Sequence, residues 1–172
     1  MSPVSTIGVQ IQNHITSLRR YARALLRDKA EADDLVQESL ARALSRADKF
    51  QPGTNLRAWL FTIMHNVHVN QVRQKVSRPD EVPVDEVELR LVTPARQETR
   101  IELRDMSRAL DALPPEQRQV LLMVALEGMK YDEVAKVLDI PIGTVMSRLS
   151  RARDAVRARL SQDGAVALRR VK

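Results

Sequence analysis

Two histidines, His65 and His68, lie three positions apart in this 172-residue chain, a spacing that places both imidazoles on one side of a helix, where they could hold a metal ion. No carboxylate lies one turn away to complete such a site, and the third histidine, His14, is distant in the sequence. The chain has no cysteine, no glycine-rich phosphate-binding loop and no credible serine–histidine–aspartate set. We therefore expect no enzyme, no metal and no cofactor, and we expect histidines that lie at the surface or face DNA.

A second group of polar side chains, between Gly143 and Arg153, fits binding better than catalysis. On a helical wheel, Val145, Leu149 and Ala152 fall on one side, and hydroxyls and guanidinium groups point away from them. Ser147 is at the centre of this outward face, beside Thr144, Ser150 and Arg151, with Met146, Arg148 and Arg153 at its edges. Arginine bonds guanine edges through paired donors and hydroxyls reach bases or phosphates, so the face suits the major groove of DNA. A solvated arginine-rich face is the alternative, but such faces usually include glutamate.

The segment before this helix completes a helix-turn-helix pattern. Tyr131, Val134, Ala135 and Leu138 share one face of a short helix over 131–138, as a supporting helix requires. The residues Asp139–Pro141 then make a tight turn into the helix described above, which runs to about residue 160. In such a motif the second helix enters the major groove, so the pattern predicts a DNA-binding element.

The composition indicates an all-α protein with an anionic partner. Aromatic residues make up 3% of the chain and glycine occurs five times, whereas 44% of the residues are hydrophobic. Lysine and arginine number 28 against 22 aspartate and glutamate, a formal charge of +6, which favours nucleic acid over a merely basic surface. No apolar run approaches the roughly 20 residues that cross a bilayer, and residues 1–10 lack a secretion signal. We expect no membrane insertion and a cytoplasmic protein.

The first half of the chain predicts three helices. One runs from Ile11 to Arg27, and a second begins after Asp28, which with Glu31 forms a capping box. The apolar positions of the second helix include Leu44. A Pro-Gly pair breaks the chain between residues 49 and 55, and Thr54 is the expected cap of a third helix. This third helix ends near residue 76 and should bury Leu56, Trp59, Leu60, Ile63 and Val67.

Prolines and carboxylates dominate residues 77–98, which predicts an extended acidic linker. Helices resume after it, with apolar positions at Leu103, Met106 and Leu110. A further helix begins at the Pro114-Pro115 pair and stops at Gly128. The chain therefore divides into a domain over 10–76, the linker over 77–98 and a helix-turn-helix domain over 99–165.

Several segments in this order resemble one family, the extracytoplasmic-function (ECF) sigma factors of bacterial RNA polymerase. The segments similar to its C-terminal domain are Leu110–Pro114, Tyr131–Ala135, Pro141–Val145, Ser147–Leu149 and Arg151–Arg153. Those similar to its N-terminal domain are Ala32–Glu38, which resembles the helix that docks on core polymerase, and Leu56–Ile63 with Asn66, which resembles the promoter-melting region. The resemblance covers about residues 10–75 and 99–160, and four such motifs in order make it specific.

The resemblance implies a division of labour among named residues. Docking on core RNA polymerase falls to Asp33, Asp34, Gln37 and Glu38; recognition of the promoter −10 element falls to Phe50, Asn55, His65, Asn66, Asn70 and Arg73; and recognition of the −35 element falls to Thr144, Ser147, Arg148, Arg151 and Arg153. Trp59 is a core residue in this interpretation, and Asn66 is equally compatible with a buried structural amide. Met146 departs from the basic residue that many members carry, which leaves the −35 sequence open. The linker would occupy the polymerase cleft as an RNA-like polyanion, or serve as a solvated tether.

The function implied is that of an alternative sigma factor that binds core RNA polymerase and promoter DNA and is held inactive by an anti-sigma protein. Two other classes are weighed against it. A sigma-like decoy that captures the anti-sigma protein should lose the basic recognition face, which this chain keeps at Ser147, Arg148 and Arg151. A stand-alone helix-turn-helix repressor would need neither a helix like that over 33–38 nor a melting segment.

Overall fold

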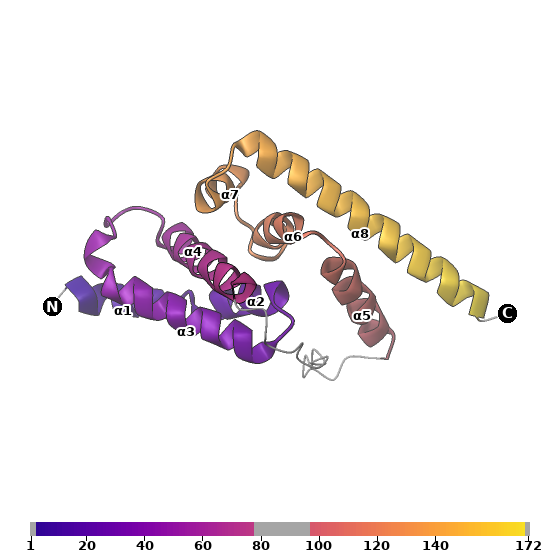
Figure 1. Ribbon diagram of the computed structural model, residues 1–172, viewed down its shortest axis with the longest axis horizontal. Helices are drawn as coiled ribbons and strands as arrows, with labels where there is room; N and C mark the ends of the chain where they lie inside the picture. The colour runs from indigo at the N-terminus through magenta and orange to yellow at the C-terminus, as the bar shows by residue number, and fades with distance from the viewer. Residues whose placement is uncertain (1–2, 78–96, 171–172) are drawn as a thin grey trace.

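The computed structural model describes residues 3–77 and 97–170, and within these ranges all regular structure is helical. The expected linker falls almost wholly outside the described residues. Figure 1 shows the helices before residue 77 as one body and those after residue 96 as a second, with the last helix along the outer edge. The two bodies contact each other through several side chains.

The N-terminal body consists of α1 (Pro3–Gln12), α2 (Ile15–Leu25), α3 (Lys29–Ser45), the short 3-10 turn η1 (Ala47–Lys49) and α4 (Leu56–Val76). The single helix expected over 11–27 is wrong, because the chain turns at Asn13 and His14, whose amides bond back to Gln10 and Ile11. Asp28 caps α3 as expected, its Oδ1 accepting from the amide of Glu31 at 2.9 Å. The Glu31 carboxylate does not complete a capping box, since it pairs with Lys75.

Asn55, rather than Thr54, caps α4. The Oδ1 atom of Asn55 accepts a hydrogen bond from the amide of Ala58 at 3.0 Å, whereas the Thr54 hydroxyl donates to the carbonyl of Gln51. An amide oxygen at this position satisfies a backbone donor that the first turn of a helix leaves free. The cap therefore fixes where α4 starts and how the preceding loop approaches it.

The N-terminal core is made where α2, α3 and α4 pack together. Leu18, Leu35 and Val67 are fully buried, and the rings of Tyr21 and Phe61 meet edge to face at 5.2 Å. Leu60 and Ile63 are buried as expected, but Leu56 and Trp59 are only partly buried. The prediction for Leu44 is wrong: 45% of this residue is exposed near the end of α3.

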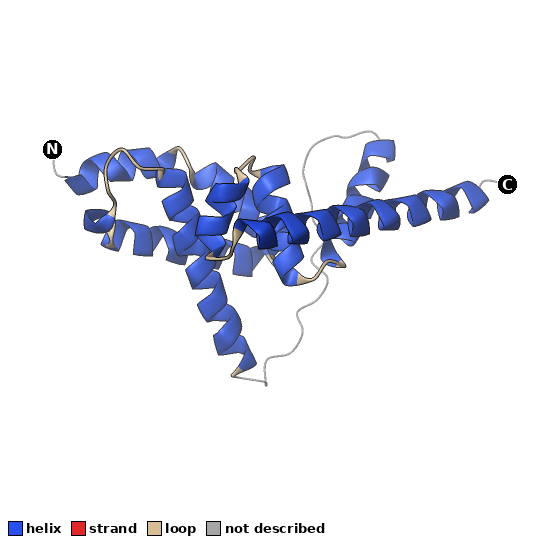
Figure 2. Ribbon diagram, turned by 90° about the horizontal axis from the view of Figure 1, so that it is seen from above, coloured by secondary structure: helices blue, strands red, loops and turns tan. Residues whose placement is uncertain are grey.

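The C-terminal body consists of α5 (Gln97–Asp111), α6 (Pro115–Leu121), a π-helical turn η2 (Leu122–Leu126), α7 (Tyr131–Leu138) and α8 (Ile142–Arg170). The helix-turn-helix is therefore α7 and α8, joined by a turn in which Asp139 adopts a left-handed φ of 52°. Gly128 ends the preceding segment with a φ of 62°, a conformation that favours glycine. Figure 2 shows α8 extending past the rest of its body toward the C-terminus.

The C-terminal core follows the stripe that the sequence predicts on α8. Val145, Leu149 and Ala152 are at most 2% exposed and pack against buried residues of α6 and α7 such as Val120 and Val134. The expectation for α5 is less accurate, because its outer positions Leu103 and Met106 are exposed and the buried residue is Ala109. The stripe on α8 turns the opposite face of that helix toward solvent.

Candidate nucleic-acid and polymerase interfaces

The outward face of α8 presents the hydroxyls and guanidinium groups expected to read DNA. Ser147 and Arg151 are exposed, while Thr144 and Arg148 are half-buried at the edge of the helix-turn-helix. The Ser147 hydroxyl donates to the carbonyl of Thr144 at 3.1 Å. Met146, at the edge of the same outward face, is 53% exposed. Because the buried stripe fixes the rotation of α8, these side chains form one surface that is free to enter a groove.

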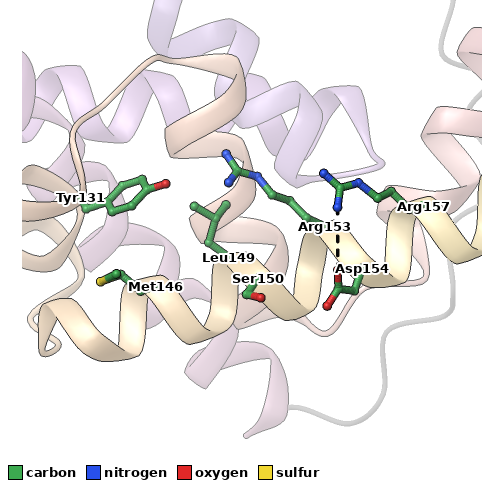
Figure 3. Close-up of a pocket in the computed structure, with 7 residues that line it drawn as sticks. All are labelled: Tyr131, Met146, Leu149, Ser150, Arg153, Asp154 and Arg157. Carbon is green, nitrogen blue, oxygen red and sulfur yellow. Dashed lines mark ion pairs between the residues drawn. The ribbon is translucent and has the colours of Figure 1, made fainter.

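Arg153 lies at the edge of that surface, beside a hollow of about 270 Å³ that Met146 and Ser150 also line. Figure 3 shows its guanidinium on the side of the helix that faces Tyr131, away from Ser150. Arg157 and Asp154 also line the hollow and form an ion pair at 4.0 Å. An arginine at this edge suits a phosphate contact, whereas it is displaced from the helix face that would meet base edges.

An aromatic pair joins the loop before α4 to α4 itself. Phe50 is half-buried, and its ring lies 5.3 Å from that of Trp59 with a tilt of 52°. Trp59 itself packs against the core, which agrees with its expected structural role. The loop therefore carries one aromatic face supported from within the protein, an arrangement on which a base can stack.

The outer side of α4 carries the other residues expected at the −10 element. Asn66, Asn70 and Arg73 are exposed, so the alternative of a buried structural amide at Asn66 is wrong. His65 and His68 are half-buried, and burial lowers the pKa of both imidazoles below the ordinary value of 6.5. The lowered pKa favours the neutral imidazole, which offers hydrogen-bonding groups rather than charge.

The residues expected to dock on polymerase divide into two kinds on α3. Asp34 and Gln37 are exposed, so they are available to a partner. Asp33 pairs with Arg23 at 3.5 Å, and the Glu38 carboxylate binds both Arg42 at 2.6 Å and the amide of Gln71 at 2.9 Å. Asp33 and Glu38 thus contribute to contacts within the N-terminal body.

A cluster that sequence analysis missed joins the two bodies around Glu127. The carboxylate of Glu127 is completely buried and accepts hydrogen bonds from Arg20 Nε at 3.0 Å and Arg20 Nη2 at 2.9 Å. Ser17 also donates to it, and Arg57 Nη2 lies 3.5 Å away and donates to the Glu127 carbonyl. The signal in the sequence is a single carboxylate that directly follows the apolar run over 120–126.

The described part of the chain holds no group of three or more histidine, cysteine, aspartate or glutamate side chains placed to bind a metal. The ionisable groups that act on His68 are those of His65, Lys75 and Glu31. The ammonium group of Lys75 would repel a bound cation. No helix among the described residues is long and apolar enough to span a membrane.

Two family models match separate parts of the chain: the sigma2 domain of PhyR over residues 11–65, and sigma-70 region 4 over residues 103–156. The ECF RNA polymerase sigma factor EcfG of Rhodopseudomonas palustris is 38% identical over 151 residues, which make up 88% of this chain and 83% of EcfG.

Solved structures resemble the chain across both bodies. The sigma factor RpoE from Bartonella quintana, in a co-crystal with the anti-sigma factor NepR, is 31% identical with a TM-score of 0.79, and the match covers 91% of this chain and 97% of that one. CnrH, in complex with the cytosolic domain of CnrY, is 28% identical with a TM-score of 0.67, over 91% of this chain and 88% of that one.

Proposed function

This chain belongs to the ECF sigma factors, and we propose that its two bodies read the two promoter elements while α3 binds core RNA polymerase. As a member of the family it is a regulatory DNA-binding protein that directs polymerase to specific promoters. The observation that carries the residue assignments is the outward face of α8, where Ser147 and Arg151 are exposed opposite a fully buried stripe.

In the proposed −35 contact, α8 lies in the major groove with Ser147, Arg148 and Arg151 toward the base edges. Thr144 and Arg153 flank this group and contact phosphates on either side. Since Met146 is exposed beside them, it contributes an apolar contact where many members of the family have a charge.

In the proposed −10 contact, a base leaves the stack and is held by the loop before α4. Stacking on Phe50 replaces the energy lost when the base unstacks, and the Asn55 amide offers a donor and an acceptor to its edge. The side chains of His65, Asn66, Asn70 and Arg73 extend this contact along the outer side of α4.

Core polymerase binds α3 through Asp34 and Gln37 in this proposal. Asp33 and Glu38 support this surface through their ion pairs with Arg23 and Arg42. The exposed Asp34 carboxylate beside an apolar seam complements a basic helix of the polymerase clamp. The domain division follows: residues 10–76 bind polymerase and the −10 element, 77–98 connect through the polymerase cleft, and 99–165 bind the −35 element. The chain acts in the cytoplasm, where polymerase works, and catalyses no reaction of its own.

Control by an anti-sigma factor accompanies this function. RpoE of Bartonella quintana was crystallised with the anti-sigma factor NepR, and the match to it extends over both bodies of this chain. A decoy that only captures an anti-sigma factor would have no use for the exposed arginines of α8, and the similarity to EcfG runs through that helix-turn-helix.

Transcription in vitro over a random promoter library tests the assignment. Core polymerase with the purified chain should start transcripts from templates that share a −10 and a −35 element. The isolated chain should bind the same templates weakly, because polymerase is needed to hold the two DNA-binding bodies at the right spacing. Tight, footprinted binding by the isolated chain would instead favour a stand-alone repressor.

A further inference from the structure

Glu127 is a carboxylate whose removal from water depends on contact between the two bodies. Its side chain has no exposed surface, and the side chains that bind it, those of Ser17, Arg20 and Arg57, belong to the N-terminal body. A buried carboxylate is tolerated only when it is paired and hydrogen-bonded. The pairing of Glu127 therefore exists only while the bodies are closed on each other, and separation would return the carboxylate to water.

The closed arrangement also engages Asn55, one of the residues proposed to contact the −10 element. The Oδ1 of Asn55 accepts from Ala58, and its Nδ2 donates to Glu133 Oε1 of α7 at 2.6 Å. The Asn55 amide is thus engaged at both its oxygen and its nitrogen, and it must leave Glu133 before both of its N–H groups can meet a base. Ser147 and Arg151 remain exposed in the same arrangement, as do Asn66 and Asn70 of α4, so closure restrains Asn55 and leaves the residues proposed for the −35 element free.

We propose that Glu127 is an intramolecular latch that keeps the chain closed before it meets polymerase, and that polymerase binds the open form. This inference rests on the proposed function, and it goes beyond it by placing a restraint within the chain itself, independent of any anti-sigma factor. Because polymerase selects the open form, weakening the latch raises the open fraction and lowers the apparent Kd for polymerase by the same factor.

The absence of cysteine from the sequence permits a direct distance measurement. Donor and acceptor dyes are attached at Gln12→Cys in α1 and Ser161→Cys in α8, both exposed positions outside the proposed sites. Energy transfer is measured in the labelled chain and in the same chain with Glu127→Gln or Arg20→Ala. The matched controls are Glu102→Gln and Arg19→Ala, which change the same charges at exposed positions. Core polymerase affinity is measured in parallel on unlabelled chains.

The latch predicts lower energy transfer in Glu127→Gln and Arg20→Ala, unchanged transfer in both controls, and about fivefold tighter binding of Glu127→Gln to core polymerase. Since Arg20 is half-exposed, its variant decides the matter if Glu127→Gln fails to fold. Transfer that is equal in wild type and Arg20→Ala overturns the latch, even if the chain directs transcription. Reduced transfer in a chain that never binds core polymerase upholds the closed state and overturns the proposed function.

Discussion

The side chains of Asn55 and Glu133 join the two bodies at 2.6 Å, and each of them also holds the first turn of its own helix. Asn55 accepts from the amide of Ala58 at the start of α4, and Glu133 Oε2 accepts from the amide of Lys130 at the start of α7. One hydrogen bond thus connects the N-terminal caps of α4 and α7, which belong to different bodies. This hydrogen bond holds the loop before α4 against α7 while the bodies are closed.

A double-mutant cycle on this pair separates capping from contact between the bodies. Asn55→Asp keeps a good N-cap but places a second carboxylate against Glu133, so it should destabilise the closed chain. Glu133→Gln should restore stability in the Asn55→Asp background, because the amide introduced by that substitution can donate to the new carboxylate. We expect a coupling free energy of about 1 kcal/mol in urea unfolding.

Asn55→Ala in a Glu133→Ala background provides the comparison for the cap alone, because in the wild-type background it also removes the hydrogen bond to Glu133. In the Glu133→Ala background it should cost about 1 kcal/mol through loss of the α4 cap. Additive free energies for Asn55→Asp and Glu133→Gln would show that the two side chains do not meet in solution.

Local signals made the helix-turn-helix predictable from the sequence. The bounds expected for α7 agree with those observed, and the buried stripe of α8 follows the helical wheel, because Val145 and Leu149 repeat at helical spacing within one segment. The breaks at Gly128 and Asp139 are equally local, since each depends on the backbone angle of one residue.

Contacts between distant segments were not predictable in the same way. Arg20 lies off the apolar stripe of its helix and has the pattern of a solvent-facing side chain, yet it binds Glu127 across 107 positions. Phe61 falls outside the expected buried set and is buried on another face of α4, where its ring meets that of Tyr21 in α2. Periodicity identifies one buried face of a helix, and it does not reveal a second.

Replacing Arg151 with Ala tests the reading of the −35 element. Loss of a bidentate contact should cost about 1–3 kcal/mol at one base position and relax selectivity there, while other positions keep their preference. Selection from a library randomised across the −35 element measures this. Arg159→Ala is the matched control, since Arg159 is exposed on the same helix beyond the helix-turn-helix. Equal selectivity in the two variants would remove Arg151 from the base-reading set.

Asp34→Lys tests polymerase docking on α3. Asp34 is exposed and forms no ion pair within the described part of the chain, so reversing its charge should abolish holoenzyme formation and leave the fold intact. The measurement is binding to core polymerase together with thermal unfolding. Adding Glu38→Lys should weaken polymerase binding further. It also breaks the contacts of Glu38 with Arg42 and Gln71, so it should lower the unfolding temperature.

Asp132→Lys supplies the control for this reversal. Asp132 is exposed on α7, so the same change of charge there should leave polymerase binding within about twofold of wild type. Full holoenzyme formation by Asp34→Lys would refute the docking surface.

The histidines of α4 should make the chain less stable as the pH falls. Burial lowers the pKa of His65 and His68 in the folded chain below 6.5, whereas in the unfolded chain both return to the ordinary value. The unfolded state then binds more protons below about pH 6.5, so the free energy of unfolding decreases as the pH falls through this range. Urea unfolding at a series of pH values from neutral downward measures the slope.

Replacing both histidines with glutamine should flatten that slope by removing two of the groups that titrate differently in the two states. His14, whose pKa is lowered by burial and by the charge of Arg57, accounts for a further part, so His14→Gln should flatten the slope again. An unchanged slope in the His65→Gln, His68→Gln variant would mean that these imidazoles take up protons as readily in the folded chain as in the unfolded one.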